Sequence, residues 1–243
     1  MDLLVVGAGE MGRWIARTVD RPVAVTDVDA ATAERAATDL GAGVRAVSTD
    51  TTETFDAVCL AVPISVVGEA VDRYAPRADR AMCDVSGVMR EPVAAMRDAL
   101  PDRERVSMHP LFAASNAPGN VAVVADASGP VTDAIRSEVA AAGNHLFETT
   151  VTEHDTAMET VQAGAHTAIL AYALAAADVR EEFATPVSAA MDDLVETVTG
   201  GTPRVYREIQ ETFDGADRVA DAARRVADAE GEAFDDLYRE AGK

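Results

Sequence analysis

The sequence predicts an α/β fold, with a doubly wound and mostly parallel sheet followed by an all-α region. Three observations indicate this fold: strand and helix patterns alternate up to about residue 150, a glycine-rich turn stands between the first two apolar strands, and no strand pattern follows. Alternating strands and helices are typical of parallel sheets with helices on both faces. We therefore expect two domains, residues 1–150 and residues 151–243.

The first element, residues 3–27, has the pattern of a strand, a G-x-G-x-x-G turn, a helix start and a second strand. In such a turn Gly7 permits the tight bend, Gly9 lets the backbone approach a pyrophosphate, and Gly12 lets the helix pack closely on the strand. The helix N-terminus also presents free N–H groups to the phosphates. The segment predicts a dinucleotide-binding domain of the Rossmann type.

Asp27 ends the second predicted strand. A carboxylate at this position accepts hydrogen bonds from a ribose 2′-hydroxyl and repels a 2′-phosphate, so NAD is favoured over NADP. Asp29 is an alternative residue for the same role. The competing interpretation makes Asp27 an ordinary N-cap of the helix that follows.

The remaining elements of the first domain follow in alternation. The predicted strands are 44–47, 55–62, 81–85, 106–108, 121–125 and 145–148, and the predicted helices are 30–40, 63–74, 90–100 and 131–142. Cys59 and Cys83 fall in buried strands, and we interpret them as reduced core thiols rather than as a disulfide or a metal pair.

The second domain contains only helical patterns. An alanine-rich helix is expected over residues 152–183, and further helices begin at Pro186, at Pro203 and after Asp214-Gly215. Four helices in about ninety residues offer little apolar surface for an independent core. We expect this domain to pack on a second copy of the chain, as an all-α dimerisation domain.

The composition excludes several classes of protein. Asp and Glu total 42 against 21 Lys and Arg, the net charge is −21, and Lys243 is the only lysine. Such a surface suits the salt-rich cytoplasm of a halophilic host. A surface for a cationic partner is the competing interpretation, but the acids are scattered. Nucleic-acid binding is not expected, because no basic stripe is present.

We also expect a cytoplasmic protein without a membrane segment or a metal site. No N-terminal signal precedes the first strand, and the longest apolar stretch, residues 167–177, is too short to span a bilayer. The four histidines and two cysteines show no metal-ligand spacing.

His109-Pro110 follows the strand 106–108, at the carboxyl end of the predicted sheet. Open α/β sheets bind their ligands at that end. A loop histidine there can accept a proton from a substrate hydroxyl while a hydride leaves the same carbon, and its ordinary pKa near 6.5 suits that role. The alternative is a histidine that caps the loop or pairs with a carboxylate.

Along nearly its whole length the chain resembles the prephenate dehydrogenase family. The resemblance is carried by the residues Gly7–Gly12, Ala61-Val62-Pro63, Asp84-Val85-Ser86, His109-Pro110-Leu111-Phe112, Glu153-His154-Asp155 with His166, and Thr202–Ile209. It implies NAD-dependent oxidative decarboxylation of prephenate to 4-hydroxyphenylpyruvate. In that reaction His109 would hold the 4-hydroxyl, and His166 would sit near the substrate's carboxylate or side chain, unless it is a core histidine. His154 is expected to start a helix and pair with neighbouring acids.

The residues that the turn and the resemblance together assign to the cofactor are Gly7, Gly9, Glu10, Met11, Gly12, Arg13, Asp27, Val62 and Pro63.

The sequence departs from the family pattern at two places. The family usually has Ser-Val-Lys where this chain has Gly87-Val88-Met89, and Ser86, one position early, is the candidate to replace that serine beside His109. The family also tends to carry a substrate-binding arginine at the position of Thr197. Prephenate has two carboxylates and needs local cations.

Arg204 and Arg207 are the nearest candidates for those cations. Their alternative interpretation is as surface arginines paired with Glu208 or Glu211.

Two other functions stay open from the sequence. One is an arogenate dehydrogenase, or another small NAD(P)-dependent oxidoreductase such as an imine-type reductase. The other is an NAD-binding regulator without activity, which the missing serine, lysine and arginine would suit and the retained His109 would not.

Overall fold

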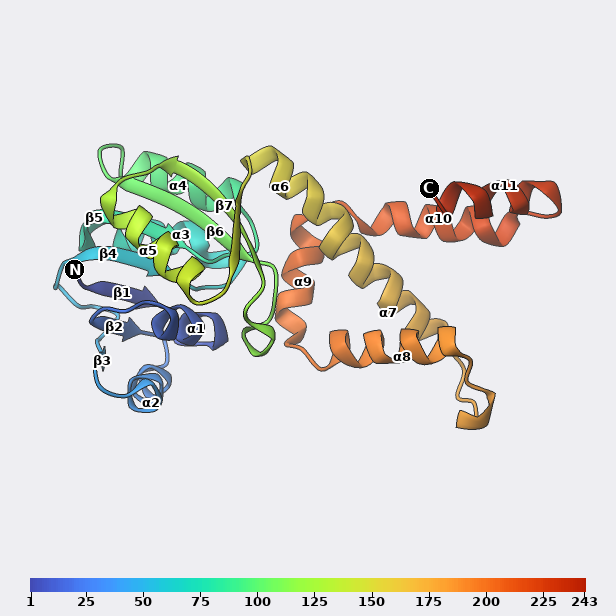
Figure 1. Ribbon diagram of the computed structural model, residues 1–243, viewed down its shortest axis with the longest axis horizontal. Coiled ribbons are helices and arrows are strands. Elements are labelled where there is room, and N and C mark those ends of the chain that lie inside the picture. The colour runs from blue at the N-terminus through green and yellow to red at the C-terminus, as the bar shows by residue number, and fades with distance from the viewer. The chain divides into compact units, whose positions relative to one another are not determined.

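One sheet of eight strands organises the first two thirds of the chain in a computed structural model of the protein (Figure 1). The structure describes the backbone of residues 1–243 and every side chain except that of Glu181. It divides into two compact units, Met1–Asp155 and Thr156–Lys243. The strands are β1 (Leu3–Val6), β2 (Val23–Thr26), β3 (Val44–Ala46), β4 (Phe55–Leu60), β5 (Ala78–Asp84), β6 (Glu104–Pro110), β7 (Asn120–Ala127) and β8 (His145–Glu148).

The sheet has the strand order β3-β2-β1-β4-β5-β6-β7-β8. Strands β1 to β6 run parallel, whereas β7 is antiparallel to β6 and parallel to β8. The direction of winding reverses between β1 and β4, which is where doubly wound sheets open a crevice for a ligand. The predicted α/β class is confirmed.

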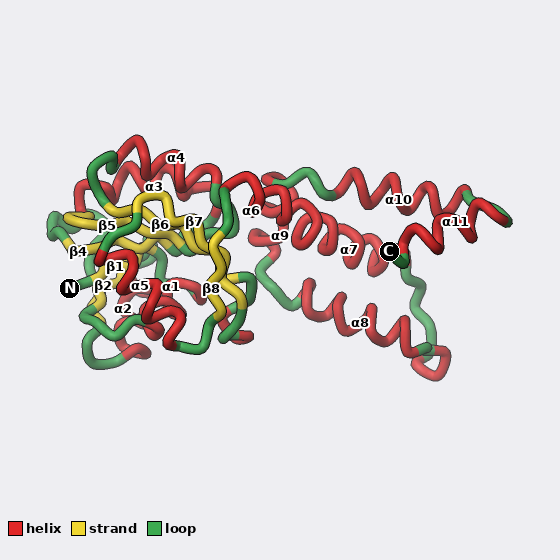
Figure 2. Tube along the Cα trace, turned by 45° about the horizontal axis from the view of Figure 1, so that its top comes forward, coloured by secondary structure: helices red, strands yellow, loops and turns green.

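Helices cover both faces of the sheet (Figure 2). One core lies between the sheet and α1 (Glu10–Thr18), α2 (Ala30–Leu40) and α5 (Pro130–Ala141), and the other lies under α3 (Val67–Tyr74) and α4 (Arg90–Ala99). Strands buried on both faces need continuous apolar runs, and β1 and β2 are buried at every position. Cys59 and Cys83 are free, buried and opposite each other in neighbouring strands.

Strand β6 is longer than the sequence predicts, and this changes the setting of His109. The loop expected after Met108 is instead a continuation of the strand through Pro110, because β7 returns antiparallel and pairs His109 with Ala122. His109 is therefore fixed by a strand rather than carried on a loop.

The second unit contains helices and no strand among the residues that the structure describes. Helix α6 (Val151–Met158) leads into it from the first unit, and the helices that follow are α7 (Ala165–Ala175), α8 (Pro186–Thr199), α9 (Pro203–Thr212), α10 (Ala216–Asp228) and α11 (Glu232–Ala241).

The single helix predicted over residues 152–183 is wrong in two respects. A π-helical turn at Glu159–Gly164 separates α6 from α7, and Gly215 packs so closely there that a Cβ on it would stand 2.6 Å from the backbone nitrogen of Gly164. The side chains of residues 176–180 are exposed, and a helix without packing is marginally stable. The predicted C-terminal helix is also divided, by Gly231 with a φ of +54°.

No helix in the described part of the chain is long and apolar enough to cross a membrane.

Candidate active site

The turn after β1 has the geometry that a dinucleotide site needs. Gly7 has a φ of +97°, and a Cβ on it would overlap the carbonyl group of Ala61. A Cβ on Gly12 would overlap the carbonyl oxygen of Gly7 and stand 2.9 Å from its carbonyl carbon. A Cβ on Gly9 would meet nothing within 4 Å. Gly7 and Gly12 thus close the turn tightly, while the exposed Gly9 leaves space over the start of α1, where a pyrophosphate fits.

Asp27 follows β2 and holds the turn in place. Its carboxylate accepts hydrogen bonds from the N–H of Ala8 at 2.8 Å and of Asp29 at 3.0 Å. The N-cap of α2 is Asp29, which accepts from the N–H of Ala31. Asp27 therefore is not the N-cap of α2, and its half-exposed carboxylate stands at the end of β2, where a ribose would be recognised.

The other residues expected at the cofactor surround this turn. Val62 faces Gly7, with its Cγ1 3.5 Å from where a Cβ would stand, and Pro63 is the N-cap of the short 3₁₀ helix Ile64–Val66. Glu10 is exposed and Met11 packs against the core under α1.

Arg13 is engaged within the protein. Its Nε donates to the carbonyl of Ala8 at 3.1 Å and its Nη1 to Asp39 at 2.6 Å. These contacts place it beside the turn as part of its support, with its charge already paired.

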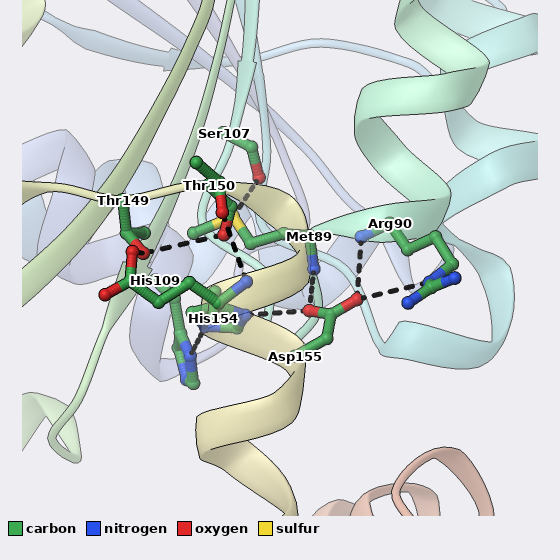
Figure 3. Close-up of polar contacts among 9 residues, drawn as sticks. Met89, Arg90, Ser107, His109, Thr149, Thr150, His154 and Asp155 are labelled. Atoms are coloured by element: carbon green, nitrogen blue, oxygen red, sulfur yellow. Dashed lines mark hydrogen bonds and ion pairs between the residues drawn. The ribbon is translucent and has the colours of Figure 1, made fainter.

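His109 lies at the carboxyl end of β6 and has only 6% of its surface exposed. Its Nδ1 lies 2.9 Å from Nε2 of His154, and Nδ1 of His154 lies 2.8 Å from Oδ1 of Asp155 (Figure 3). Asp155 also accepts the backbone N–H groups of Met89 at 3.1 Å and Arg90 at 3.2 Å. Three side chains from β6 and α6 thus form one hydrogen-bonded series that ends on α4.

Helix α6 brings His154 and Asp155 inward. The N–H of His154 donates to the carbonyl of Thr150 at 2.9 Å. The N–H of Glu153 donates to Oγ1 of Thr150 at 3.2 Å, so Thr150 starts the helix. Figure 3 shows this first turn beside His109.

Burial sets the charge of these groups. Burial, and to a smaller extent the neighbouring His154, lower the pKa of His109 to about 3, although Asp155 acts in the opposite direction. His109 is therefore neutral at pH 7 and can accept a proton. Burial alone would raise the pKa of Asp155, but the hydrogen bonds from His154 and from the N–H groups of Met89 and Arg90 outweigh it, so that pKa lies below its ordinary value.

Ser86 was expected beside His109, but it forms no side-chain hydrogen bond to it. Its Oγ is buried and has no hydrogen-bond partner among the described residues. It stands beside Asp84, which accepts its N–H at 3.0 Å and whose pKa burial raises to about 7. The neighbour of His109 on this segment is Gly87, where a Cβ would lie 3.7 Å from Nε2 of His109.

The second unit contains the other predicted substrate residues. His166 on α7 is half-buried and packs edge-on against Tyr206 of α9, with 4.8 Å between ring centroids. Burial lowers its pKa. Arg204 and Arg207, also on α9, are exposed and stand 3.8 and 3.9 Å from Glu208 and Glu211, in the alternative pairing that the sequence left open.

The described residues contain no group of three His, Cys, Asp or Glu that could hold a metal ion. The fold, the glycine turn and the neutral histidine at the carboxyl edge of the sheet define a class of protein, the NAD-dependent dehydrogenases.

Comparison with known proteins narrows this class. Residues 12–126 match the model of the prephenate dehydrogenase nucleotide-binding domain. A 4-amino-4-deoxyprephenate dehydrogenase of Streptomyces pristinaespiralis is 32% identical over 244 residues, which cover 92% of this chain and 81% of the relative. The chain therefore belongs to the prephenate dehydrogenase family.

Solved structures share the fold. The prephenate dehydrogenase of Aquifex aeolicus, in complex with hydroxyphenyl propionate and NAD⁺, matches with a TM-score of 0.72 at 15% identity over 100% of this chain and 92% of that one. The arogenate dehydrogenase of Synechocystis matches with a TM-score of 0.67 at 15% identity over 100% of this chain and 98% of that one.

Proposed function

We propose that the protein oxidises and decarboxylates prephenate to 4-hydroxyphenylpyruvate, with His109 as the catalytic base. The observation that carries this proposal is a buried, neutral imidazole at the carboxyl edge of a sheet whose opening turn fits a dinucleotide. A protonated histidine would be unable to accept the hydroxyl proton.

The reaction needs one proton acceptor from the protein. Because Nδ1 of His109 contacts His154, Nε2 is the atom that takes the proton of the substrate's 4-hydroxyl as the bond between C4 and its hydrogen breaks. The turn from Gly7 to Gly12 would hold NAD, which would supply the hydride acceptor. The bond from C1 to its carboxylate then breaks, and its electron pair completes the aromatic ring. Carbon dioxide leaves, and the product oxygen recovers the proton from His109.

Arg204 and Arg207 are the cations we propose for the substrate's carboxylates, with His166 as a further contact. Both arginines are exposed, and their ion pairs with acids one helical turn away are 3.8 and 3.9 Å long, so either side chain can turn to a ligand. Arg204→Gln and Arg207→Gln should raise KM at nearly unchanged kcat. Arg224→Gln, at an exposed arginine paired with Asp221 on α10, is the matched control. Equal KM values for all three variants would refute the assignment.

The test of the reaction is NADH formation in buffer of high potassium concentration, with prephenate or arogenate and with NAD or NADP. Turnover of prephenate with NAD, lost in His109→Gln while NAD binding is retained, is the expected result. His109→Gln with unchanged turnover would refute the role of His109. Turnover of arogenate but not of prephenate would make arogenate the substrate and the protein an arogenate dehydrogenase.

The relative from Streptomyces favours a second candidate substrate, because its name refers to an analogue with an amine at C4. His109 would then meet an amine rather than a hydroxyl. Turnover of 4-amino-4-deoxyprephenate in the same assay, at a higher kcat/KM than that of prephenate, would make the amine the substrate.

We further propose that the second unit forms a homodimer. Its exposed large apolar side chains include Leu174, which is 89% exposed, together with Val161, Val179, Phe183, Val187, Leu194, Val205, Val226, Phe234 and Tyr238. Monomeric proteins rarely expose so much apolar surface in one region. Light scattering after gel filtration should give a dimer, and Leu174→Glu should weaken it with NAD binding retained. A wild-type monomer would refute this.

The acidic composition supports a cytoplasm rich in salt as the working environment. A net charge of −21 destabilises the folded state by repulsion, which salt screens. The melting temperature should rise steeply between about 0.1 and 2 M KCl, and a flat response would contradict a halophilic origin.

A further inference from the structure

We propose that His154 and Asp155 are positioning residues, which fix His109 in the tautomer that carries its proton on Nδ1 and its lone pair on Nε2. The inference rests on the proposed role of His109 as a base. It explains why Nε2, and not Nδ1, is the nitrogen that accepts the proton. The hydrogen bonds that join Asp155, His154 and His109 support it.

The first step is the charge and direction of Asp155. Backbone N–H groups only donate, so the contacts from Met89 and Arg90 require acceptor oxygens on Asp155. These two N–H groups belong to the N-cap and the first residue of α4, whose positive dipole end also favours a negative charge. Met89 supplies no side-chain cap of its own. Asp155 is therefore an ionised cap of α4, contributed by a different helix.

The second step is the tautomer of His154. Its Nδ1 lies 2.8 Å from the same oxygen of Asp155 that accepts the N–H of Met89. An ionised carboxylate only accepts, so Nδ1 of His154 carries a proton. A neutral imidazole has a proton on one nitrogen only, which leaves Nε2 of His154 as an acceptor. Only 3% of the surface of His154 is exposed, so its two ring nitrogens face Asp155 and His109 rather than solvent.

The third step reaches His109. Its Nδ1 lies 2.9 Å from the acceptor Nε2 of His154 and must donate to it. The lone pair of neutral His109 is then on Nε2, the nitrogen beside Gly87. When Nε2 takes a proton, the positive charge of His109 is stabilised through His154 by the charge of Asp155. The same logic holds for the aspartate of a serine protease triad, which orients a histidine without taking its proton.

Histidine labelled with ¹⁵N gives a direct test in the full chain, because there are only four histidines to assign. Spectra of the wild type at pH 7 should show the Nδ1–H tautomer for both His109 and His154. His154→Phe keeps the ring shape and removes the acceptor, and it should release His109 into a mixture of tautomers. His145→Gln changes an exposed histidine and is the matched control, with no effect on His109. An Nε2–H tautomer of His109 in the wild type would overturn the proposal.

Kinetics supply the second readout. His154→Phe should lower kcat by on the order of 10² to 10⁴, the range for general base catalysis, with NAD affinity unchanged. His154→Gln restores an oxygen acceptor near the place of Nε2 and should recover all but about tenfold of that loss. Asp155→Asn leaves His154 in place and tests the same series of hydrogen bonds from its other end. It should lower kcat by about 10² or more. Equal kcat values for His154→Phe and the wild type would overturn the proposal.

The two readouts separate this inference from the proposed function. If no candidate substrate is turned over but His109 has the Nδ1–H tautomer and loses it in His154→Phe, the positioning role stands and the proposed reaction fails. If turnover is observed but His109 has the opposite tautomer, the reaction stands and the positioning role fails.

Discussion

Gly9 and Gly12 stand three residues apart in the same turn, and alanine at each should give opposite results. A Cβ at Gly12 overlaps the backbone carbonyl of Gly7, which cannot rotate away, so α1 must shift. Overpacking of this kind costs about 3 kcal/mol, and alanine in a helix returns about 1 kcal/mol, which leaves a net loss of about 2 kcal/mol. At about 2–4 °C per kcal/mol, the melting temperature should fall by roughly 4–8 °C.

At Gly9 the added Cβ meets nothing within 4 Å, and the φ of −71° suits any residue. The free energy of unfolding should change by less than about 1 kcal/mol, because the lost N-cap preference and the lower entropy of the unfolded chain oppose each other. The methyl group would occupy the space over α1 that the pyrophosphate needs, so the Kd for NAD should rise at least about tenfold. Thermal unfolding and NAD titration of both variants test this. A stable Gly12→Ala protein, or Gly9→Ala with wild-type affinity, would refute the reasoning.

Three further predictions follow from charges in the first unit. Asp27→Ala should narrow the preference for NAD over NADP by about tenfold or more, measured as the ratio of their Kd values, and an unchanged ratio would exclude a ribose contact. Burial lowers the pKa of His109 to about 3, so the folded state binds this proton only at a lower pH than the unfolded state does. Below pH 6.5 the wild type should therefore lose about 1.4 kcal/mol per pH unit relative to His109→Gln in urea unfolding, and parallel curves would contradict this. Burial raises the pKa of Asp84 from 3.8 to about 7, so the folded state binds this proton more tightly and loses stability as the pH rises from about 4 to about 7. In urea unfolding, Asp84→Asn should therefore gain stability relative to the wild type between about pH 4 and pH 8, and a constant difference over that range would contradict this.

The sequence was sufficient for the features set by local pattern. The turn from Gly7 to Gly12 and the alternation of strands and helices along the chain depend on backbone sterics and on apolar runs, both of which are visible in a single sequence. The extension of β6 through His109 was missed because it depends on pairing with β7, a contact between segments. The π-helical turn after α6 was missed for the same reason, since it faces Gly215 from a distant helix.

His109 as the central residue of the candidate site stays a prediction, and the side chains that hold it were not predicted. The interpretation of Ser86 as a partner of His109 followed its position in the sequence, whereas its Oγ forms no hydrogen bond in the structure. His154 was expected to pair with acids, and it does bond Asp155; its second contact, with His109, crosses 45 residues of sequence. The adjacent pair His154-Asp155 was the sequence signal that could have revealed this contact. A histidine whose one nitrogen bonds an acid can hold a second imidazole in one tautomer through its other nitrogen. The direction in which the His154 side chain points depends on where α6 begins, and the hydrophobic pattern of the sequence does not reveal the role of Thr150 at that start.

The cap that Asp155 forms on α4 has a consequence for how the active site can be monitored. The amide hydrogens of Met89 and Arg90 are covered by the same carboxylate that orients His154, so they can exchange with solvent deuterium only when the carboxylate withdraws. Their exchange rates thus measure the fraction of time in which the first turn of α6 is detached and the base is unaligned. Two backbone amides would thus report the opening of the site in the resting enzyme.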